Sequence, residues 1–181
     1  QQKFKYIATF LDDYSAYSVV KLLRYKSDVY QAVTEVFALL ENKIDKKVKA
    51  VRTDNGGEYT SALLASYYKK KGIDPQTTMP YTPQQNGKAE RLNRTLMEKT
   101  RSMLNETGLP DGLWGEAMMS ANYLRNRSPS ANRVKTPLEL MFGVKPDLTN
   151  LRVFGCEAFV LIPKQKRTKL DETSEKGIFI G

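Results

Sequence analysis

The chain has 181 residues, enough for one ordinary domain with a hydrophobic core, and its 29 Lys and Arg against 20 Asp and Glu give a net charge of +9. This excess favours a polyanionic partner such as nucleic acid, although a generic basic protein would carry it too. The chain has no histidine, which excludes His-Cys zinc modules, Ser-His-Asp triads and histidine general bases. Its one cysteine, Cys156, cannot form an internal disulfide. Any catalysis therefore rests on carboxylates, Lys, Tyr or hydroxyls.

The first half of the chain alternates between strand-like and helix-like segments. Residues 4–11 and 16–24 are rich in aromatic and β-branched side chains around a turn at residues 12–15, which predicts a β-hairpin. After the N-cap pair Ser27-Asp28, apolar side chains recur at helical spacing to about residue 43. We then expect three further elements, namely a short strand at residues 47–53, a helix at 61–71 with Gly72 after its end, and a brief strand at 76–79.

The second half is predicted to be mostly helical. A polar loop at residues 82–87 leads into a long helix from Lys88, which is broken at residues 108–110. A further helix is expected at residues 114–126, and a short helical turn opens at residues 136–137. Strands followed by helices indicate an α/β domain of roughly 140 residues.

The last part of the chain has a different pattern. Residues 151–162 are strand-like, residues 164–169 are basic, and residues 176–180 begin another strand, so we expect the first half of a small β module. The basic stretch suits either a DNA backbone or a charged hairpin loop. Because the chain begins Gln-Gln-Lys without a methionine and ends in a strand-like stretch, we expect both ends to be cuts from a longer polypeptide.

Two carboxylates lie where chemistry is expected. Asp54 follows the strand at residues 47–53 and opens a glycine-rich turn, and Glu90 lies in the first turn of the long helix. Phosphoryl transfer without histidine needs a metal ion, and Mg²⁺ (or Mn²⁺) takes hard oxygen ligands, so Asp54 and Glu90 are predicted to be metal ligands and catalytic residues. The alternative is structural, with Asp54 capping its turn and Glu90 complementing the helix N-terminus.

Asp54 and Glu90 belong to a longer pattern. Residues 53–59 are Thr-Asp-Asn-Gly-Gly-Glu-Tyr, residues 80–91 are Pro-Tyr-Thr-Pro-Gln-Gln-Asn-Gly-Lys-Ala-Glu-Arg, and 35 residues separate the two carboxylates (90 − 54 − 1 = 35). This pattern resembles the catalytic core of Ty1/copia-type retrotransposon integrases, whose D,D(35)E signature has that spacing. The resemblance covers essentially the whole chain, through four further stretches at residues 11–15, 123–129, 135–137 and 151–156.

The resemblance implies a fold and an activity. The fold is α/β, an RNase H-like mixed sheet flanked by helices over residues 1–145, followed by the start of a small SH3-like β module over residues 150–181. The parent protein is then an integrase, a polynucleotidyl transferase that trims the ends of linear element DNA and joins the new 3′ hydroxyls to target DNA. The family's middle carboxylate maps onto Asp54 and its final glutamate onto Glu90.

One part of the family's active site is not in this sequence. The family's first catalytic aspartate lies on a strand before residues 4–11, in an Asp-x-x-Gly-Pro context that this chain lacks, and the family's preceding zinc-binding module is absent too. Asp12 and Asp13 match the family's hairpin-turn aspartates, so we expect them to be structural. The fragment alone is therefore predicted to be weakly active or inactive.

Partners and supporting residues follow from the same resemblance. The expected partner is double-stranded DNA, both element ends and target, bound by a homo-multimer that acts in the nucleus after a stage in a cytoplasmic particle. No membrane contact is expected, since no apolar run reaches spanning length. DNA contacts are predicted for five residues beside Glu90, with loop solvation or a solvated helix surface as the alternative: Gln85, Asn86, Lys88, Arg91 and Arg94.

Two other functions compete with that of an integrase. Another RNase H-like nuclease, such as a transposase or resolvase, would use the same kind of carboxylate site. A domesticated or decayed integrase-derived module would bind DNA or protein without catalysis, and the missing first aspartate keeps that alternative open.

Overall fold

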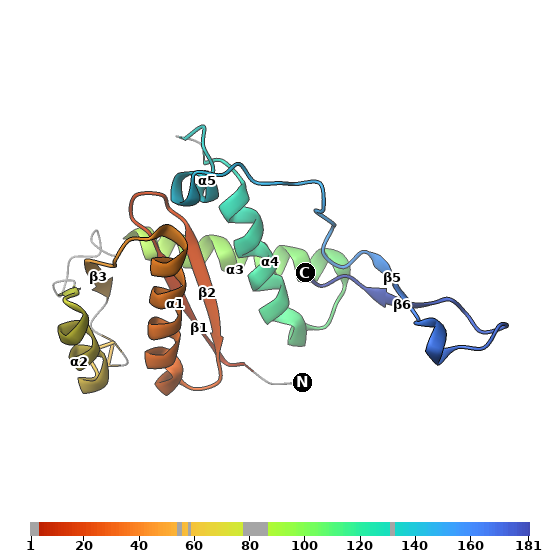
Figure 1. The fold of residues 1–181 in the computed structure, drawn as a ribbon, viewed down its shortest axis with the longest axis horizontal. Coiled ribbons are helices and arrows are strands. Elements are labelled where there is room, and N and C mark those ends of the chain that lie inside the picture. Colours follow the sequence, from red (N-terminus) through yellow and green to blue (C-terminus); the bar gives the residue numbers. More distant parts are fainter. Residues whose placement is uncertain (1–3, 54–55, 58, 78–86, 131–132) are drawn as a thin grey trace.

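The computed structural model describes residues 4–53, 56–57, 59–77, 87–130 and 133–181 (Figure 1). A β-hairpin lies between one helix and a pair of helices, a second pair of strands lies beside it, and a third pair projects from the far end. No helix in these ranges is both long and apolar enough to cross a membrane. The main elements, in chain order, are β1 (Tyr6–Leu11), β2 (Ser18–Leu23), α1 (Val29–Ile44), β3 (Ala50–Thr53), α2 (Ala62–Lys71), β4 (Asp74–Thr77), α3 (Gly87–Thr107), α4 (Trp114–Arg127), α5 (Pro137–Phe142), β5 (Glu157–Leu161) and β6 (Ser174–Ile178).

The first hairpin forms where the sequence pattern predicts it. β1 and β2 pair in antiparallel register, with Leu11 opposite Ser18 at the turn end. Asp12 holds the turn, because its Oδ2 accepts the backbone N–H of Ser15 at 2.7 Å and the hydroxyl of Ser15 at 2.6 Å. The structural role expected for Asp12 is therefore confirmed.

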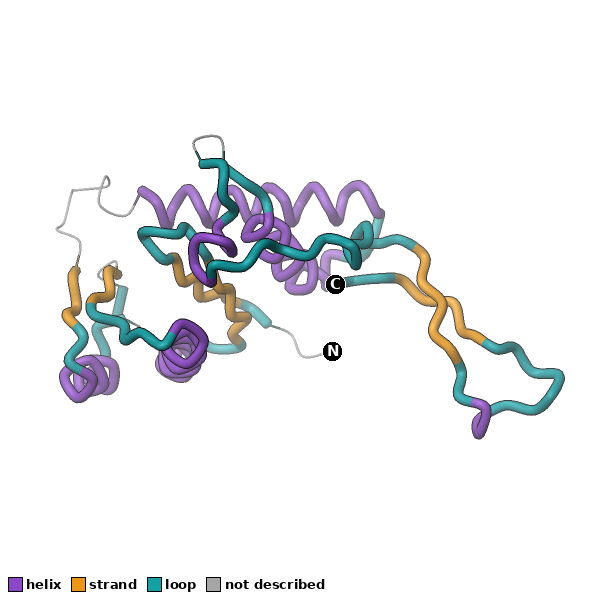
Figure 2. The backbone as a smooth tube through the Cα atoms, turned by 45° about the horizontal axis from the view of Figure 1, so that its top comes forward, coloured by secondary structure: helices purple, strands orange, loops and turns teal. Residues whose placement is uncertain are grey.

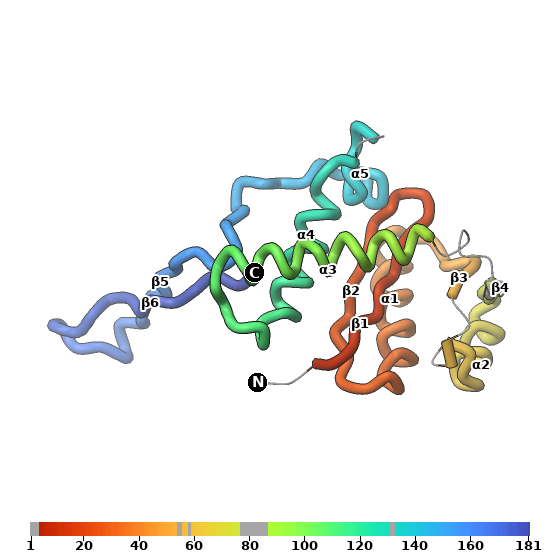
Figure 3. Tube along the Cα trace, turned by 180° about the vertical axis from the view of Figure 1, so that it is seen from behind, coloured from red at the N-terminus to blue at the C-terminus, as the bar shows by residue number. Residues whose placement is uncertain are grey.

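The two faces of this hairpin pack against different helices. Ala8 and Phe10 of β1 join a core with α1 and α2, whereas Ile7 and Leu11 join a second core with α3 and α4. Alternate strand residues point to opposite faces. The hairpin is therefore the middle layer of three, with α1 on one face and α3 and α4 on the other (Figure 1, Figure 3).

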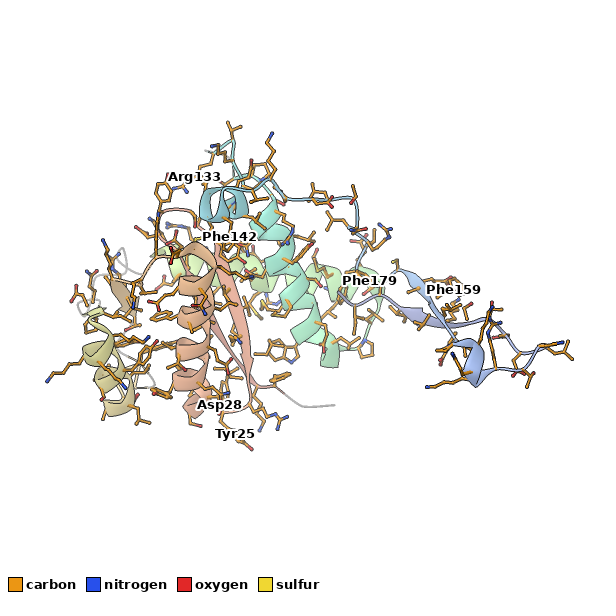
Figure 4. The ribbon with its side chains drawn as sticks, in the orientation of Figure 1. Tyr25, Asp28, Arg133, Phe142, Phe159 and Phe179 are labelled. Atoms are coloured by element: carbon orange, nitrogen blue, oxygen red, sulfur yellow. The ribbon has the colours of Figure 1, made fainter. Side chains whose placement is uncertain are left out.

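α1 begins directly after Asp28, as the N-cap pattern predicts, but the side chain of Asp28 does not cap it. Its Oδ2 instead accepts the backbone N–H groups of Arg24 at 3.1 Å and Tyr25 at 2.9 Å, which closes the turn between β2 and α1 (Figure 4). The buried face of α1 is apolar and consists of Val29, Ala32, Val33, Val36 and Phe37.

Both ends of α2 are set by local chemistry. The hydroxyl of Ser61 accepts the N–H of Leu64 at 3.4 Å and so caps the first turn. Gly72 ends the helix with a φ of +68°, a left-handed conformation that glycine adopts without steric cost. Between these ends, α2 buries Leu64 and Tyr68 in the core that it shares with α1.

β3 and β4 form a parallel pair, from Ala50 opposite Asp74 to Thr53 opposite Thr77. β4 begins at Asp74, two residues before the predicted position, because the N–H of Asp74 already donates to the C=O of Lys49 at 2.8 Å. Residues 78 and 79 of the predicted strand lie outside the described residues. Val51 packs into the core with α1, which places this pair beside the first hairpin.

α3 and α4 pack against each other, and α4 packs against β2. Gly115 permits the close approach of α4, since a Cβ at this position would lie 2.8 Å from Cδ1 of Leu22. The second core lies between these elements and is built by Val20, Leu92, Leu96, Met118 and Ala121.

A buried polar contact joins β2 to α4. The N–H of Ser18 donates to Oδ1 of Asn126 at 2.9 Å, and Nδ2 of Asn126 donates back to the C=O of Ser18 at 2.7 Å. Nδ2 of Asn122 donates to the same C=O at 3.0 Å. All three residues are buried. The two amides therefore satisfy backbone groups at the edge of β2 that faces away from β1.

Of the two C-terminal strands, β5 is shorter than predicted and β6 is shifted. The pattern of residues 151–162 predicts one long strand, but β5 covers only its second half. Phe154 is buried in a third core with α3 and α4, and Gly155 turns the chain with a φ of +82°, so the strand cannot start earlier. β6 begins two residues before the predicted position and pairs antiparallel with β5. This hairpin projects from the rest of the chain (Figure 2).

We expect Asn126→Ala to lower the free energy of unfolding by about 2 kcal/mol, since the N–H of Ser18 stays buried without a partner. Urea denaturation followed by circular dichroism measures the loss. Asn105→Ala, on the exposed surface of α3, is the matched control and should change stability by less than about 0.5 kcal/mol. Equal losses in both variants would show that the contact between β2 and α4 adds nothing to stability.

Tyr68 is expected to make stability depend on pH in the alkaline range. Its burial, with smaller contributions from Tyr59 and Tyr67, raises the pKa of Tyr68 from 10.0 to about 12. Because the folded pKa lies above the unfolded one, the neutral phenol stabilises the fold fully below pH 10, and about 2–3 kcal/mol is lost as the pH rises towards 12. Urea titrations at about pH 9 and about pH 11.5 should show a smaller loss for Tyr68→Phe than for the natural chain. Parallel losses would contradict this assignment.

Candidate functional site

Glu90 lies in the first turn of α3, three residues after the helix begins at Gly87. Its side chain is exposed, and within the described part of the chain its carboxylate has no hydrogen bond or ion pair. The helix dipole stabilises a negative charge at this end. Glu90 is therefore a charged carboxylate whose oxygens are open to a ligand from outside the chain.

The elements that carry the two predicted carboxylates meet at one cavity. Thr53, the last residue of β3 and the sequence neighbour of Asp54, lines a cavity of about 580 Å³. Ala89 of α3, the sequence neighbour of Glu90, lines the same cavity. Asp54 itself lies outside the described residues. The structure thus brings the end of β3 to the start of α3, as the predicted convergence requires (Figure 3).

The residues predicted to contact DNA fall into two groups. Gln85 and Asn86 lie outside the described residues, so their role stays a prediction. Lys88 is engaged, because its Nζ forms an ion pair with Asp13 in the turn of the first hairpin. The hydrogen bond from Lys88 lowers the pKa of Asp13, and Arg52 lowers it further. Both partners of the ion pair are exposed, so a phosphate can compete for Lys88.

Arg91 and Arg94 lie on the exposed surface of α3. Arg94 lies one helical turn after Glu90. Arg101 is also exposed and lies two turns after Arg94. Sequence reasoning missed Arg101, although its spacing of seven residues from Arg94 was an available signal. Positive charge therefore continues along one side of α3 from the candidate site, interrupted by Glu98, and such a surface attracts phosphates.

The described residues alone do not complete a metal site. Among them, no group of three His, Cys, Asp or Glu side chains converges. Asp12 is bonded within the hairpin turn and Asp13 is in an ion pair with Lys88, so both carboxylates already have partners in the structure. Glu90 offers the hard oxygens that Mg²⁺ prefers. A metal ion at this end of α3 would therefore need ligands beyond the described residues, and the metal-binding roles of Asp54 and Glu90 stay predictions.

Two protein families match the chain. The integrase core domain family matches residues 1–83, which include β1 to β4. The retroviral polymerase SH3-like domain family matches residues 156–181, which include the β5–β6 hairpin. An integrase core followed by an SH3-like module is the order that the sequence pattern predicts.

Curated relatives match over most of the chain. The retrovirus-related Pol polyprotein from transposon TNT 1-94 of Nicotiana tabacum is 46% identical over 178 residues, which are 98% of this chain and 13% of that protein. The transposon Ty1-DR4 Gag-Pol polyprotein of Saccharomyces cerevisiae is 30% identical over 152 residues, which are 83% of this chain and 10% of that protein. The chain thus spans about an eighth or less of the length of these relatives.

Solved structures share the fold. The simian T-cell lymphotropic virus intasome in complex with PP2A regulatory subunit B56 gamma matches with a TM-score of 0.64 and 18% identity, covering 95% of this chain and 60% of that chain. The HTLV-2 integrase catalytic core domain in complex with magnesium, in its trimeric form, matches with a TM-score of 0.59 and 19% identity, covering 78% of this chain and 88% of that chain. The fold is therefore the RNase H-like fold of integrase cores, as predicted.

Similarity in sequence and similarity in fold agree. The two solved structures described above are an intasome and an integrase catalytic core domain, and the two sequence relatives are transposon polyproteins from a plant and a yeast. Residues 1–83 match the integrase core domain family and nearly the whole chain matches retrotransposon Pol polyproteins, so the resemblance to Ty1/copia-type retrotransposon integrases that the sequence pattern predicts is confirmed.

Proposed function

We propose that this chain supplies most of the catalytic core of an integrase that performs polynucleotidyl transfer on DNA. The reactions are trimming of the element's DNA ends and joining of the new 3′ hydroxyls to target DNA. The observation that carries this proposal is the meeting of β3 and α3 at one cavity, with Thr53 and Ala89 in its wall and Asp54 and Glu90 next to them in the sequence. The activity is assigned to the parent polyprotein, of which such a chain is a part.

In this proposal, Asp54, Glu90 and the aspartate that the family carries upstream hold Mg²⁺ (or Mn²⁺). When bound, such ions activate the attacking hydroxyl and stabilise the leaving oxygen. The HTLV-2 core domain with the same fold is in complex with magnesium, which supports the choice of ion. Glu90 suits the role of ligand because it is exposed and has no partner among the described residues.

The joining step exchanges one phosphodiester bond for another. The oxygen of a 3′ hydroxyl bonds to a target phosphorus and loses its proton to solvent, while the bond from that phosphorus to the target's own 3′ oxygen breaks and the released oxygen takes up a proton. No external energy source is needed, so the contribution of the chain is placement. The exposed guanidinium groups of Arg91 and Arg94 lie beside Glu90 in the sequence and are proposed to bind phosphates that flank the reacting one.

Double-stranded DNA is the proposed partner, and the chain is proposed to work as a homo-multimer on it in the nucleus. The net charge of +9 and the exposed arginines of α3 support binding to a polyanion. The solved structures of the same fold include an intasome and trimeric and dimeric forms of a catalytic core domain, which support the multimer.

Glu90→Gln is expected to reduce strand transfer at least about a hundredfold, because the variant keeps the shape of the side chain but loses the charge that binds metal. The variant is made in a segment extended upstream to include the family's first aspartate, and products are separated on a denaturing gel with a labelled DNA duplex and Mn²⁺. Glu98→Gln, two turns further along the exposed side of α3, is the matched control and should keep full activity. Equal activity of the two variants would remove Glu90 from the site.

The chain without the upstream segment is expected to be weakly active or inactive in the same assay, since one of the three proposed carboxylates is not in it. Adding the segment should raise strand transfer at least about a hundredfold. Full activity of the short chain would show that the first ligand is wrongly placed. If the extended protein were inactive but still bound DNA in fluorescence anisotropy, a binding module without catalysis would be the better assignment.

A further inference from the structure

Six exposed lysines lie where β3 and β4 begin. Three of them follow α1 in the segment that leads to β3, and three lie in the last turn of α2, just before β4. The two segments are adjacent, because the N–H of Asp74 donates to the C=O of Lys49 at 2.8 Å. We refer to these residues together as the lysine patch: Lys46, Lys47, Lys49, Lys69, Lys70 and Lys71.

The lysine patch holds a large share of the positive charge of the chain. Residues 45–49 and 69–74 contain the six lysines and two aspartates, a net charge of +4 (6 − 2 = 4) out of +9 for the whole sequence. One of the two, Asp74, already accepts a hydrogen bond from Nε2 of Gln76 at 3.0 Å. Within the described residues, no ammonium group of the patch forms an ion pair, whereas three lysines elsewhere do. The described part of the chain therefore does not neutralise this charge.

The electrostatics of the nearby helices explain only part of the charge. The negative end of a helix dipole favours cations, and the three lysines at the end of α2 suit that position. The effect falls off within the last turn, whereas Lys47 and Lys49 lie three and five residues beyond the end of α1 at Ile44. Like charges at close range also repel one another. A polyanion from outside the chain would relieve that repulsion.

The lysine patch lies at the end of β3 that is opposite to the candidate active site. Lys49 precedes the strand, and Thr53 ends it near Ala89 and the start of α3. Four residues of strand span about 13 Å. The basic stretch at residues 164–169 is farther still, because β3, β4 and α2 lie together at one end of the molecule and the β5–β6 hairpin at the other (Figure 3). The patch is therefore distinct from both of these regions.

The composition of the patch favours the backbone of duplex DNA over other polyanions. Residues 45–49 and 69–74 contain no aromatic side chain, so they offer no platform on which the bases of a single strand can stack. Protein interfaces are poor in lysine and rich in aromatic side chains and arginine, so an acidic protein is a worse fit. Lysine is a flexible point charge that can follow a row of phosphates without reading the bases.

We propose that the lysine patch binds the phosphate backbone of a DNA duplex independently of its sequence, on a surface other than the one beside Glu90. In the proposed function, two DNA molecules are joined, so duplex DNA must be held beyond the reacting phosphates. The inference rests on that function only for the identity of the partner. The contact itself needs neither a metal ion nor Glu90.

Acetylation of lysines, followed by mass spectrometry, locates the contact. The protein is the segment extended upstream, so that the strand the family carries before residues 4–11 is in place, with Glu90→Gln and without metal. The probe is a duplex of arbitrary sequence and about two helical turns, roughly 21 base pairs. It is expected to slow acetylation of the lysine patch at least about fivefold. Lys26, Lys135 and Lys145 are exposed too, lie outside the patch, and should change by less than about twofold.

A triple variant measures the strength of the contact. Lys46→Gln, Lys47→Gln and Lys49→Gln together should weaken duplex binding at least about tenfold at low salt, measured by fluorescence anisotropy. The slope of log affinity against log salt concentration should fall by about 2, because each phosphate contact contributes about 0.9 to it. The matched control removes the same charge from scattered exposed positions and should change affinity by less than about threefold. It consists of Lys26→Gln, Lys135→Gln and Lys145→Gln.

Protection of the lysine patch, together with weaker binding in the patch variant alone, would establish the surface. Equal losses in the two triple variants, or protection spread evenly over all lysines, would show that only overall charge matters and would overturn it. Stronger protection of the patch by a single strand, or by polyglutamate at the same concentration of charge, would assign it to another partner and also overturn it. Because every sample carries Glu90→Gln and lacks metal, these outcomes are distinct from the outcome for strand transfer.

Discussion

The side-chain amide of Asn126 does for Ser18 what a neighbouring strand would do. It accepts the N–H of Ser18 and donates to its C=O, so a buried residue at the edge of β2 is satisfied by α4. Since a buried backbone group without a partner costs about 1–3 kcal/mol, α4 cannot shift along β2 without losing stability. α3 packs against α4 in turn. The position of Glu90 at the start of α3 is therefore tied to the first hairpin through this contact.

β1 has different surroundings on its two edges. One edge is paired with β2, and Thr9 and Leu11 beside the other line the cavity that β3 also lines. Within the described residues, Val51 of β3 packs against the core that α1 builds, and this packing positions the end of β3.

Local patterns account for most of the secondary structure and for the choice of candidate residues. The first hairpin, α1, α3 and α4 form where alternation and helical spacing predict them, because the burial of one face of an element is encoded in the order of its own residues. The family and its RNase H-like fold could also be predicted, since the motifs around Asp54 and Glu90 are contiguous and their spacing can be counted. The metal-binding and DNA-binding roles of these residues remain predictions.

Other features depend on residues that are far apart in the chain. β5 starts late because Phe154 is buried in a core with Leu104 of α3 and Ala117 of α4, which lie 50 and 37 positions earlier. Lys88 pairs with Asp13 across 75 positions, and Asn126 binds the backbone of Ser18 across 108 positions. Thr53 of β3 and Ala89 of α3 line one cavity although 36 positions separate them in the sequence. Composition, period and spacing describe neighbours along the chain, whereas these contacts arise from packing in space, and for that reason they became visible only once the chain was folded.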